Sequence, residues 1–163
     1  MIRLNLLLFF LLALQVTLAS GNELPEKFIG HFKLDHSENL DDYLVAKGFG
    51  WLMRKVISFA TVTKVFAHEK QPGRYRFKNL TSKRNTDYKN FALGQEFQAE
   101  SLDSTQHKIT FFYDPSSDTV TEHHVPLNLS EPAEDFVYSI QGEFLVMKVN
   151  FNAVSAVRYY KRQ

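Results

Sequence analysis

The chain contains no cysteine among its 163 residues, so no disulfide can hold the fold together. This absence excludes the small disulfide-stapled scaffolds that are common among secreted proteins. Apolar residues make up 44% of the chain and charged residues 23%, a composition that argues against disorder and against fibrous repeats. A chain of this length can bury enough apolar surface to fold around its own core as one domain.

The chain also lacks a second long apolar run after its first twenty residues. Arg3 precedes an apolar run over residues 6–14, and small residues follow at Ala19, Ser20 and Gly21. A basic start, a short apolar stretch and small residues at the exit are typical of a secretory signal peptide. The sequence therefore predicts a signal peptide over residues 1–20 and one secreted domain over residues 21–163.

Without the predicted signal peptide, the chain has no surplus of charge of either sign. Arg3 is the only charged residue in that segment, so 18 of the 19 basic residues remain against 18 acidic ones. A balanced chain lacks the average positive charge that drives binding to phosphate backbones. We therefore expect no nucleic-acid partner.

Hydrophobic periodicity predicts an early helix pair within an otherwise β-rich chain. Residues 30–34 alternate between polar and apolar side chains, as a half-buried strand does. Ser37 is the expected N-cap of a first helix that ends near Gly48, and a second short helix is expected over residues 51–59. Further strands are expected over residues 61–68, 74–80, 86–93, 95–102, 108–113, 119–129, 136–140, 144–150 and 154–161.

This order of elements predicts an antiparallel barrel. Strands that follow one another without intervening helices pair as a meander, and closure into a barrel hides the edges of the sheet. A barrel of about ten strands is wider than its side chains can fill, so we expect an enclosed cavity. The architecture thereby favours a carrier of a small molecule.

Five segments resemble the fatty-acid-binding protein family of the calycin superfamily. They are Gly30-x-Phe32-x-Leu34, Asn39-x-Asp41-x-Tyr43-Leu44-x-x-Lys47, Arg54-Lys55-Val56, Leu93-Gly94-Gln95-Glu96-Phe97 and Arg158-x-Tyr160. Leu40 departs from the aromatic residue that is usual in the family. Residues 103–111 and 158–161, together with the leader, are similar to the secreted nematode subgroup, whose members occur in the fluid around embryos.

The resemblance implies a ten-stranded up-and-down barrel, or clam, capped by a helix-turn-helix lid. It also implies a monomer that binds long-chain fatty acids without a cofactor. Arg158 and Tyr160 lie two apart on a strand and so share one face. With that face inward, a guanidinium and a phenol can hold a carboxylate. Many family members have a second arginine twenty residues upstream, where this chain has Tyr138, so neutral lipids and retinoids become credible further ligands.

Basic side chains near the predicted lid suggest a rim that could touch an anionic membrane, although solvated surface is an equally good interpretation. These residues are Lys47, Arg54, Lys55, Lys83 and Arg84, with Lys89 near the same turn.

Two glycosylation sequons begin at Asn79 and Asn128. His123 and His124 are adjacent on a strand and so face opposite ways, which argues against a metal site with His107. The chain has no nucleophile elbow, phosphate loop or zinc signature, so we expect no enzyme.

Two other classes of protein stay open. One is an extracellular structural or embryo-coat protein whose barrel is filled by side chains. The other is a lipocalin, which fits less well because lipocalins lack a helix pair after the first strand and usually carry disulfides.

Overall fold

The computed structural model describes residues 23–128 and 131–163, so the predicted signal peptide lies outside the described residues. The described part forms ten strands, two α-helices and one 3-10 turn, Glu26–Phe28. The helices are α1 (Leu40–Ala46) and α2 (Trp51–Ser58). The strands are β1 (Gly30–Glu38), β2 (Val62–His68), β3 (Tyr75–Thr81), β4 (Thr86–Phe91), β5 (Phe97–Glu100), β6 (Gln106–Asp114), β7 (Thr119–Pro126), β8 (Glu134–Gln141), β9 (Phe144–Phe151) and β10 (Val154–Arg162).

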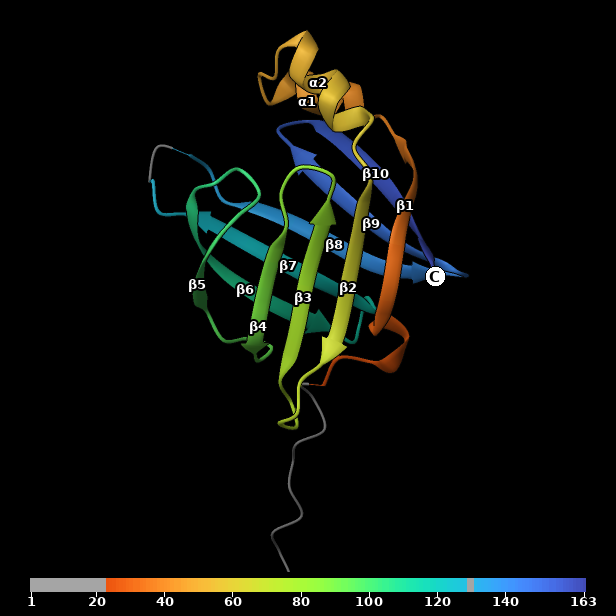
Figure 1. Ribbon diagram of the computed structural model, residues 1–163, viewed down its shortest axis with the longest axis vertical. Helices are drawn as coiled ribbons and strands as arrows, with labels where there is room; N and C mark the ends of the chain where they lie inside the picture. Colours follow the sequence, from red (N-terminus) through yellow and green to blue (C-terminus); the bar gives the residue numbers. More distant parts are fainter. Residues whose placement is uncertain (1–22, 129–130) are drawn as a thin grey trace, which may run out of the picture.

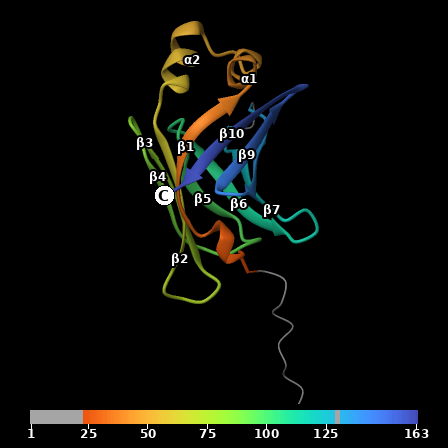
Figure 2. The ribbon, with the colours of Figure 1, turned by 90° about the vertical axis from the view of Figure 1, so that its right-hand side faces the viewer.

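The strands form one antiparallel sheet that folds back on itself. Their order is β4-β3-β2-β1-β10-β9-β8-β7-β6-β5, so consecutive strands pair with one another except for β4 and β5, and β1 also pairs with β10. In Figure 1, β1–β4 stand in front of β6–β9, and Figure 2 shows the two faces of the barrel from the side. The described residues contain no backbone ladder between β4 and β5, so the barrel is open along this seam. The predicted helix-capped clam is confirmed.

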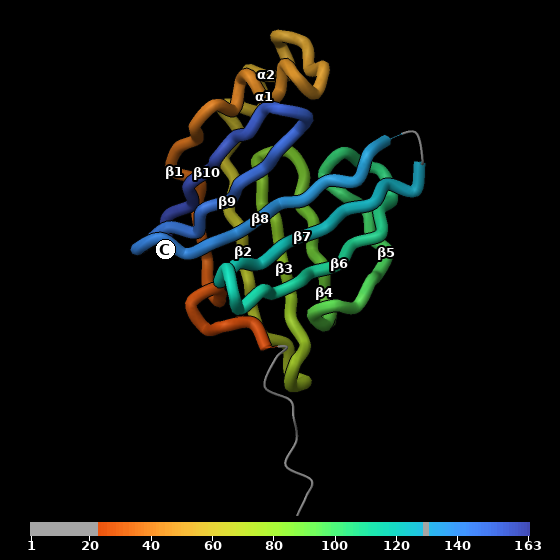
Figure 3. Tube along the Cα trace, turned by 180° about the vertical axis from the view of Figure 1, so that it is seen from behind, coloured from red at the N-terminus to blue at the C-terminus, as the bar shows by residue number. Residues whose placement is uncertain are grey.

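The two helices cover one end of the barrel (Figures 1 and 3). In α1, Tyr43 and Leu44 are buried against the barrel end. The second helix differs, because none of its residues is buried. Among the described residues, no helix is both long and apolar enough to cross a membrane.

Strand β1 runs further than its alternating pattern predicts and contains an irregularity between Leu34 and His36. The irregularity shifts the pairing, so Ser37 pairs with Arg158 inside the ladder. The prediction that Ser37 caps α1 is therefore wrong. Asn39 precedes the helix instead, in a left-handed conformation with φ of 54°, and its side chain makes no capping bond.

Several other strand boundaries differ from the prediction by a few residues, among them those of β5 and β7. Strand β5 spans only Phe97–Glu100. It begins later than predicted because the chain turns at Gly94, which adopts a φ of 74°. Strand β7 ends at Pro126, where proline has no N–H to donate to a ladder.

The core of the barrel is unusually aromatic. Phe66, Phe77, Phe111 and Tyr138 are each at most 1% exposed. Their rings contact one another from four different strands, with the centroids of Phe66 and Phe77 4.5 Å apart. These contacts fill one region of the interior and join the two faces of the barrel.

The end opposite the helices is closed by the two ends of the domain. Phe28 is fully buried, and the Arg162 guanidinium donates to the carbonyls of Lys27 and Ile29. The same guanidinium lies 4.5 Å from the ring centroid of Phe32. Gly30 has a φ of +148° here, and a Cβ at this position would lie 2.4 Å from Arg162 Nη1. The positive φ favours glycine at this position, and the close approach of the guanidinium adds to that preference.

Candidate functional site: a polar cluster inside the barrel

Arg158 and Tyr160 share the inward face of β10, as the spacing predicts. Tyr160 is fully buried, and Arg158 Cζ lies 5.7 Å from its ring centroid. Arg158 Nε donates to Ser37 Oγ at 3.2 Å. Arg158 Nη2 and the Tyr160 hydroxyl are buried, and neither has a hydrogen-bond partner among the described residues. Two unpaired donors in a water-poor interior are costly unless something accepts from them.

Tyr138 lies in the same row of side chains as Arg158. The ladder pairs Arg158 with Met147 and Met147 with Tyr138, and paired residues share a face of the sheet. Its hydroxyl is already engaged, because it donates to Glu122 Oε2 at 2.6 Å. Burial, followed by the Glu122 charge and hydrogen bond, holds the pKa of Tyr138 well above its ordinary value.

Glu122 is a buried carboxylate that the sequence reasoning missed. It is 2% exposed and accepts from Tyr138, while His124 Nε2 lies 2.8 Å from its Oε1. Burial acts to raise the pKa of Glu122, but hydrogen bonds from His124 and Tyr138 and the charges of His124 and Lys64 outweigh it and lower that pKa. Glu122 alternates with buried Val120 along β7, a signal that was available in the sequence.

Lys64 is a buried cation that was missed in the same way. It is 5% exposed on β2, and its ladder partner Phe32 is fully buried. Its Nζ donates to Asn79 Oδ1 at 2.6 Å. The same atom lies 5.2 Å from the ring centroid of Tyr138 and 5.5 Å from that of Tyr160. Alternation with Val62 and Phe66 could have placed Lys64 inside the barrel.

His123 and His124 face opposite sides of the sheet, as their adjacent positions on the strand predict. His107 and His124 point inward, with their Nδ1 atoms 3.2 Å apart, whereas His123 lies outside beside Asp135 at 2.6 Å. Within residues 23–128 and 131–163, no group of three or more acidic, histidine or cysteine side chains is arranged to hold a metal ion.

Three residues of the expected basic rim form ion pairs. Lys47 Nζ lies 2.8 Å from both carboxylate oxygens of Glu134. Arg54 donates to Asp41, and Arg84 to Glu100. Each of these three cations therefore has an acidic neighbour from another part of the chain, and the membrane contact expected of the rim stays a prediction.

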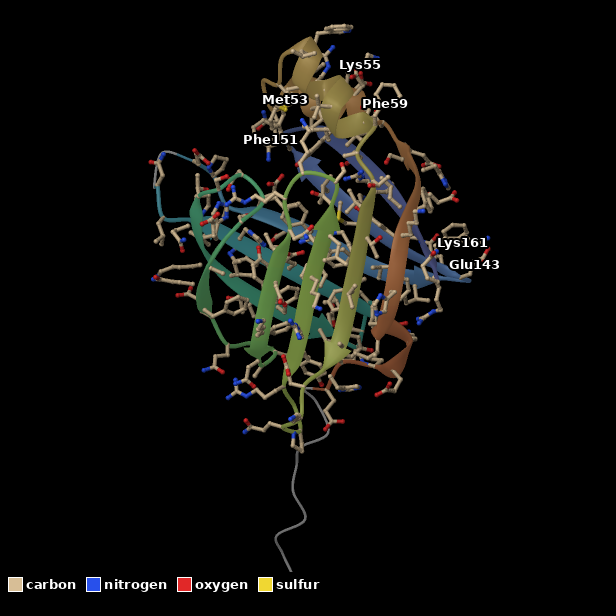
Figure 4. The ribbon with its side chains drawn as sticks, in the orientation of Figure 1. Met53, Lys55, Phe59, Glu143, Phe151 and Lys161 are labelled. Carbon is tan, nitrogen blue, oxygen red and sulfur yellow. The ribbon has the colours of Figure 1, made fainter. Side chains whose placement is uncertain are left out.

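The remaining rim residues, Lys55 and Lys83, are exposed and have no ion-pair partner in the part of the chain that the structure describes. Apolar side chains are a stronger feature of the cap than charge. Trp51 is 65% exposed, Leu52 70% and Phe59 82%. Figure 4 shows Phe59, Met53 and Lys55 together on the helical cap. The cap thus presents an apolar surface with little free charge, which the sequence pattern did not reveal.

The two sequons lie in different surroundings. Asn79 is 4% exposed and points into the barrel. There its side-chain amide accepts a hydrogen bond from Lys64 and donates one to Thr86. The folded barrel cannot hold a glycan at this position, so the prediction for Asn79 is wrong. Asn128 is exposed after β7, and the other two residues of its sequon lie outside the described residues.

A pocket of about 340 Å³ lies at the seam between β4 and β5. Tyr88, Phe91 and Phe97 line it together with polar residues, and Arg158 and Tyr160 do not belong to its lining. The pocket therefore marks a break in the wall rather than the polar cluster itself.

A helix-capped ten-stranded barrel with buried, unpaired donors defines a class of proteins that enclose small apolar ligands carrying a polar group. No family model matches the chain. The chain is 51% identical over 143 residues to a fatty acid-binding protein homolog of Ascaris suum, covering 86% of each chain. It is 46% identical over 147 residues to fatty acid-binding protein homolog 2 of Caenorhabditis elegans, covering 90% of each. The chain belongs to the fatty-acid-binding protein family.

A solved structure supports the same assignment. As-p18, an extracellular fatty acid binding protein, matches with a TM-score of 0.83 at 50% identity, over 86% of this chain and 99% of the other. A Schistosoma mansoni fatty acid binding protein in complex with arachidonic acid has the same fold, with a TM-score of 0.69 and 24% identity.

Proposed function

We propose that the protein is a secreted carrier that binds one long-chain fatty acid inside its barrel. The observation that carries this proposal is the pair of buried, unpartnered donors on Arg158 and Tyr160. A carboxylate accepts two hydrogen bonds from a guanidinium and a further one from a phenol. The names of the relatives, among them the extracellular As-p18, support both the ligand class and the secreted location.

The acyl chain supplies most of the affinity in this proposal. Each buried methylene contributes about 0.8 kcal/mol, so about 14 of them contribute roughly 11 kcal/mol before the costs of binding. The headgroup contacts with Arg158 and Tyr160 then orient the ligand. Tyr138 contacts the ligand through its ring, because its hydroxyl already donates a hydrogen bond to Glu122. Retinoids and neutral lipids would be secondary ligands.

The carrier acts as a monomer and has no catalytic role in this proposal. It reaches the extracellular space through the signal peptide predicted over residues 1–20, and fluid around the embryo is the location that the nematode subgroup suggests. The sequon at Asn128 is the remaining candidate for a glycan, since it lies on exposed chain.

The binding experiment titrates delipidated protein with a fluorescent long-chain fatty acid. We expect saturable binding of one ligand per protein. Arg158→Ala should bind about tenfold to a hundredfold more weakly, the range that corresponds to a lost charge-assisted hydrogen bond. Arg76→Ala is the matched control, because Arg76 lies on the outside of β3 and pairs with Asp87.

The outcomes separate the two classes left open by the sequence. Saturable binding that Arg158→Ala weakens and Arg76→Ala does not would support the carrier. Absence of binding by the folded wild-type protein would instead favour a structural protein with a filled barrel. An unchanged dissociation constant in Arg158→Ala would remove Arg158 from the site.

We propose further that the helical cap contacts membranes when ligand is exchanged. Trp51, Leu52 and Phe59 form the exposed apolar surface, and exposed Lys55 lies beside them to meet anionic headgroups. A cluster of exposed large apolar residues is unusual on a soluble monomer and is typical of a contact surface. Lys83 would add one further cation near the opening.

Transfer of fluorescent fatty acid to phosphatidylcholine vesicles, with and without phosphatidylserine, tests this contact. The double variant Trp51→Ser/Leu52→Ser should transfer ligand several times more slowly, because about 25 cal/mol per Å² of inserted apolar surface is lost. Phe112→Ser is the control, since Phe112 is 47% exposed on β6 rather than on the cap. Equal transfer rates for all three proteins would refute the contact.

A further inference from the structure

Lys64 has more hydrogen-bond donors than partners. An ammonium group carries three N–H donors, and within the described residues the only hydrogen bond of Lys64 Nζ is the one to Asn79 Oδ1. Its Nζ also lies 5.2, 5.2 and 5.5 Å from the ring centroids of Phe77, Tyr138 and Tyr160. Aromatic faces stabilise a cation but accept no full hydrogen bond.

The interior also holds more positive than negative charge among its lysine, arginine and carboxylate side chains. Arg158 and Lys64 are cations, and Glu122 is the carboxylate that faces them. Both oxygens of Glu122 are already engaged, by His124 and by Tyr138. A monocarboxylate would supply the one further negative charge that balances these three side chains.

Both cations lie against the same ring. Arg158 Cζ is 5.7 Å and Lys64 Nζ 5.5 Å from the centroid of Tyr160, whose hydroxyl is unpartnered. An anion that accepts from this hydroxyl would lie within reach of both side chains, because lysine has a flexible four-carbon stem. The two groups come from β10 and β2, which lie on either side of β1.

We propose that Lys64 is a second cationic contact for the ligand headgroup and that it makes the site select ionised monocarboxylates over neutral lipids such as fatty alcohols and retinol. This inference rests on the proposed fatty-acid carrier function. In the empty barrel Lys64 is held by Asn79, and on binding it donates to the carboxylate that Arg158 and Tyr160 also bind.

The electrostatics agree with this geometry. The pKa of Lys64 is lowered to about 8, chiefly by burial and in smaller part by repulsion from Arg158, while attraction to Glu122 acts in the opposite direction. A ligand carboxylate would offset that repulsion. The other titratable side chains facing this region are His124 of β7, His107 of β6, Tyr138 of β8, Tyr160 of β10 and Tyr88 of β4.

The test compares an acid with its matched alcohol. Oleate and oleyl alcohol are titrated into delipidated wild type and Lys64→Met by displacement of a fluorescent probe. We expect oleate to bind about tenfold more weakly to the variant, the loss that corresponds to one hydrogen bond to a charged group. Binding of oleyl alcohol should change less than twofold. Lys33→Met, which removes an exposed lysine from the neighbouring strand, should leave both affinities unchanged.

A second variant keeps the test valid if Lys64→Met unfolds. Lys64→Met/Glu122→Gln removes one charge of each sign, so the net charge of the interior is preserved, and it should show the same loss of preference for the acid. Wild-type affinity for oleate should also fall as the pH rises above 8, as Lys64 loses its proton, and the variants should lack this fall. Arginine stays charged across this range, so the fall cannot come from Arg158.

Failure of this inference is distinguishable from failure of the carrier function. Wild type that binds neither ligand would overturn the proposed function. Wild type that binds oleate while Lys64→Met binds it equally well, with an equal ratio of acid to alcohol affinity, would overturn the role of Lys64 alone. Equal weakening of both ligands would also overturn it, since that result indicates altered packing.

Discussion

The buried charge of Lys64 imposes a pH dependence on the stability of the empty barrel. Lys64 is buried, and chiefly for that reason its pKa is lowered from 10.5 to about 8 in the folded protein. Between these two values the folded state has released the proton whereas the unfolded state keeps it. The unfolded state then binds more protons, so the free energy of unfolding rises with pH across this interval.

The fall from 10.5 to about 8 corresponds to about 3 kcal/mol, at about 1.4 kcal/mol per pH unit. We therefore expect the wild type to gain about 3 kcal/mol over Lys64→Met as the pH is raised from 8 to 10.5. The comparison with the variant cancels the tyrosines, which titrate in the same range in both proteins. Losses that do not depend on pH, such as the bond to Asn79, also cancel.

Urea denaturation of delipidated wild type and Lys64→Met at pH 8, 9, 10 and 10.5 measures the difference. Far-UV circular dichroism is the suitable probe, because the single tryptophan, Trp51, is exposed on the cap and reports poorly on the core. Parallel pH profiles for the two proteins would refute the reasoning, since they would mean that Lys64 keeps an ordinary pKa in the folded state. A profile in which the variant gains relative to the wild type would refute it equally.

Three further predictions concern other parts of the barrel. Gly30→Ala should lower the free energy of unfolding by about 1–3 kcal/mol, because the new Cβ would lie 2.4 Å from Arg162 Nη1 at a φ of +148°; an unchanged urea midpoint would contradict this. Glu134→Gln should speed amide hydrogen exchange in α1 about fivefold, because about 1 kcal/mol is lost from the contact with Lys47. Mass spectrometry would detect this change, and exchange at the wild-type rate would mean that the pair does not anchor the helix. The pKa of Glu122 is lowered below its ordinary 4.5 in the folded state, so its stabilising contribution is lost as the pH falls through that lowered value. Acid titration of wild type should therefore show a steeper loss of stability below pH 4.5 than Glu122→Gln, and superimposable curves would refute this.

The buried charges show how much the alternation of apolar and polar residues along a strand can predict. Lys64 alternates with Val62 and Phe66, and Glu122 with Val120, so both could have been placed on the inward face. Charged residues are seldom buried without partners, and their partners lie on other strands. The pattern therefore could not distinguish a functional interior charge from an interruption of the apolar face.

The ion pairs of the basic rim could not be predicted for a related reason. Lys47 and its partner Glu134 are 87 residues apart in the chain, so no local pattern reveals that this cation is neutralised. The sequon at Asn79 is likewise a local motif, and its burial between Lys64 and Thr86 depends on two neighbouring strands.

Local chemistry in the sequence determined the alternating strands, the helix pair, their order along the chain, and the common face of Arg158 and Tyr160. These features depend on residues only a few positions apart, whose periodicity is set by backbone geometry. Tertiary structure alone decided which charges meet inside the barrel, which cations on the cap are neutralised, and that Ser37 belongs to β1 rather than to a helix cap. Such outcomes depend on the register between strands that are distant in sequence, and that register is set by closure of the whole sheet around its core.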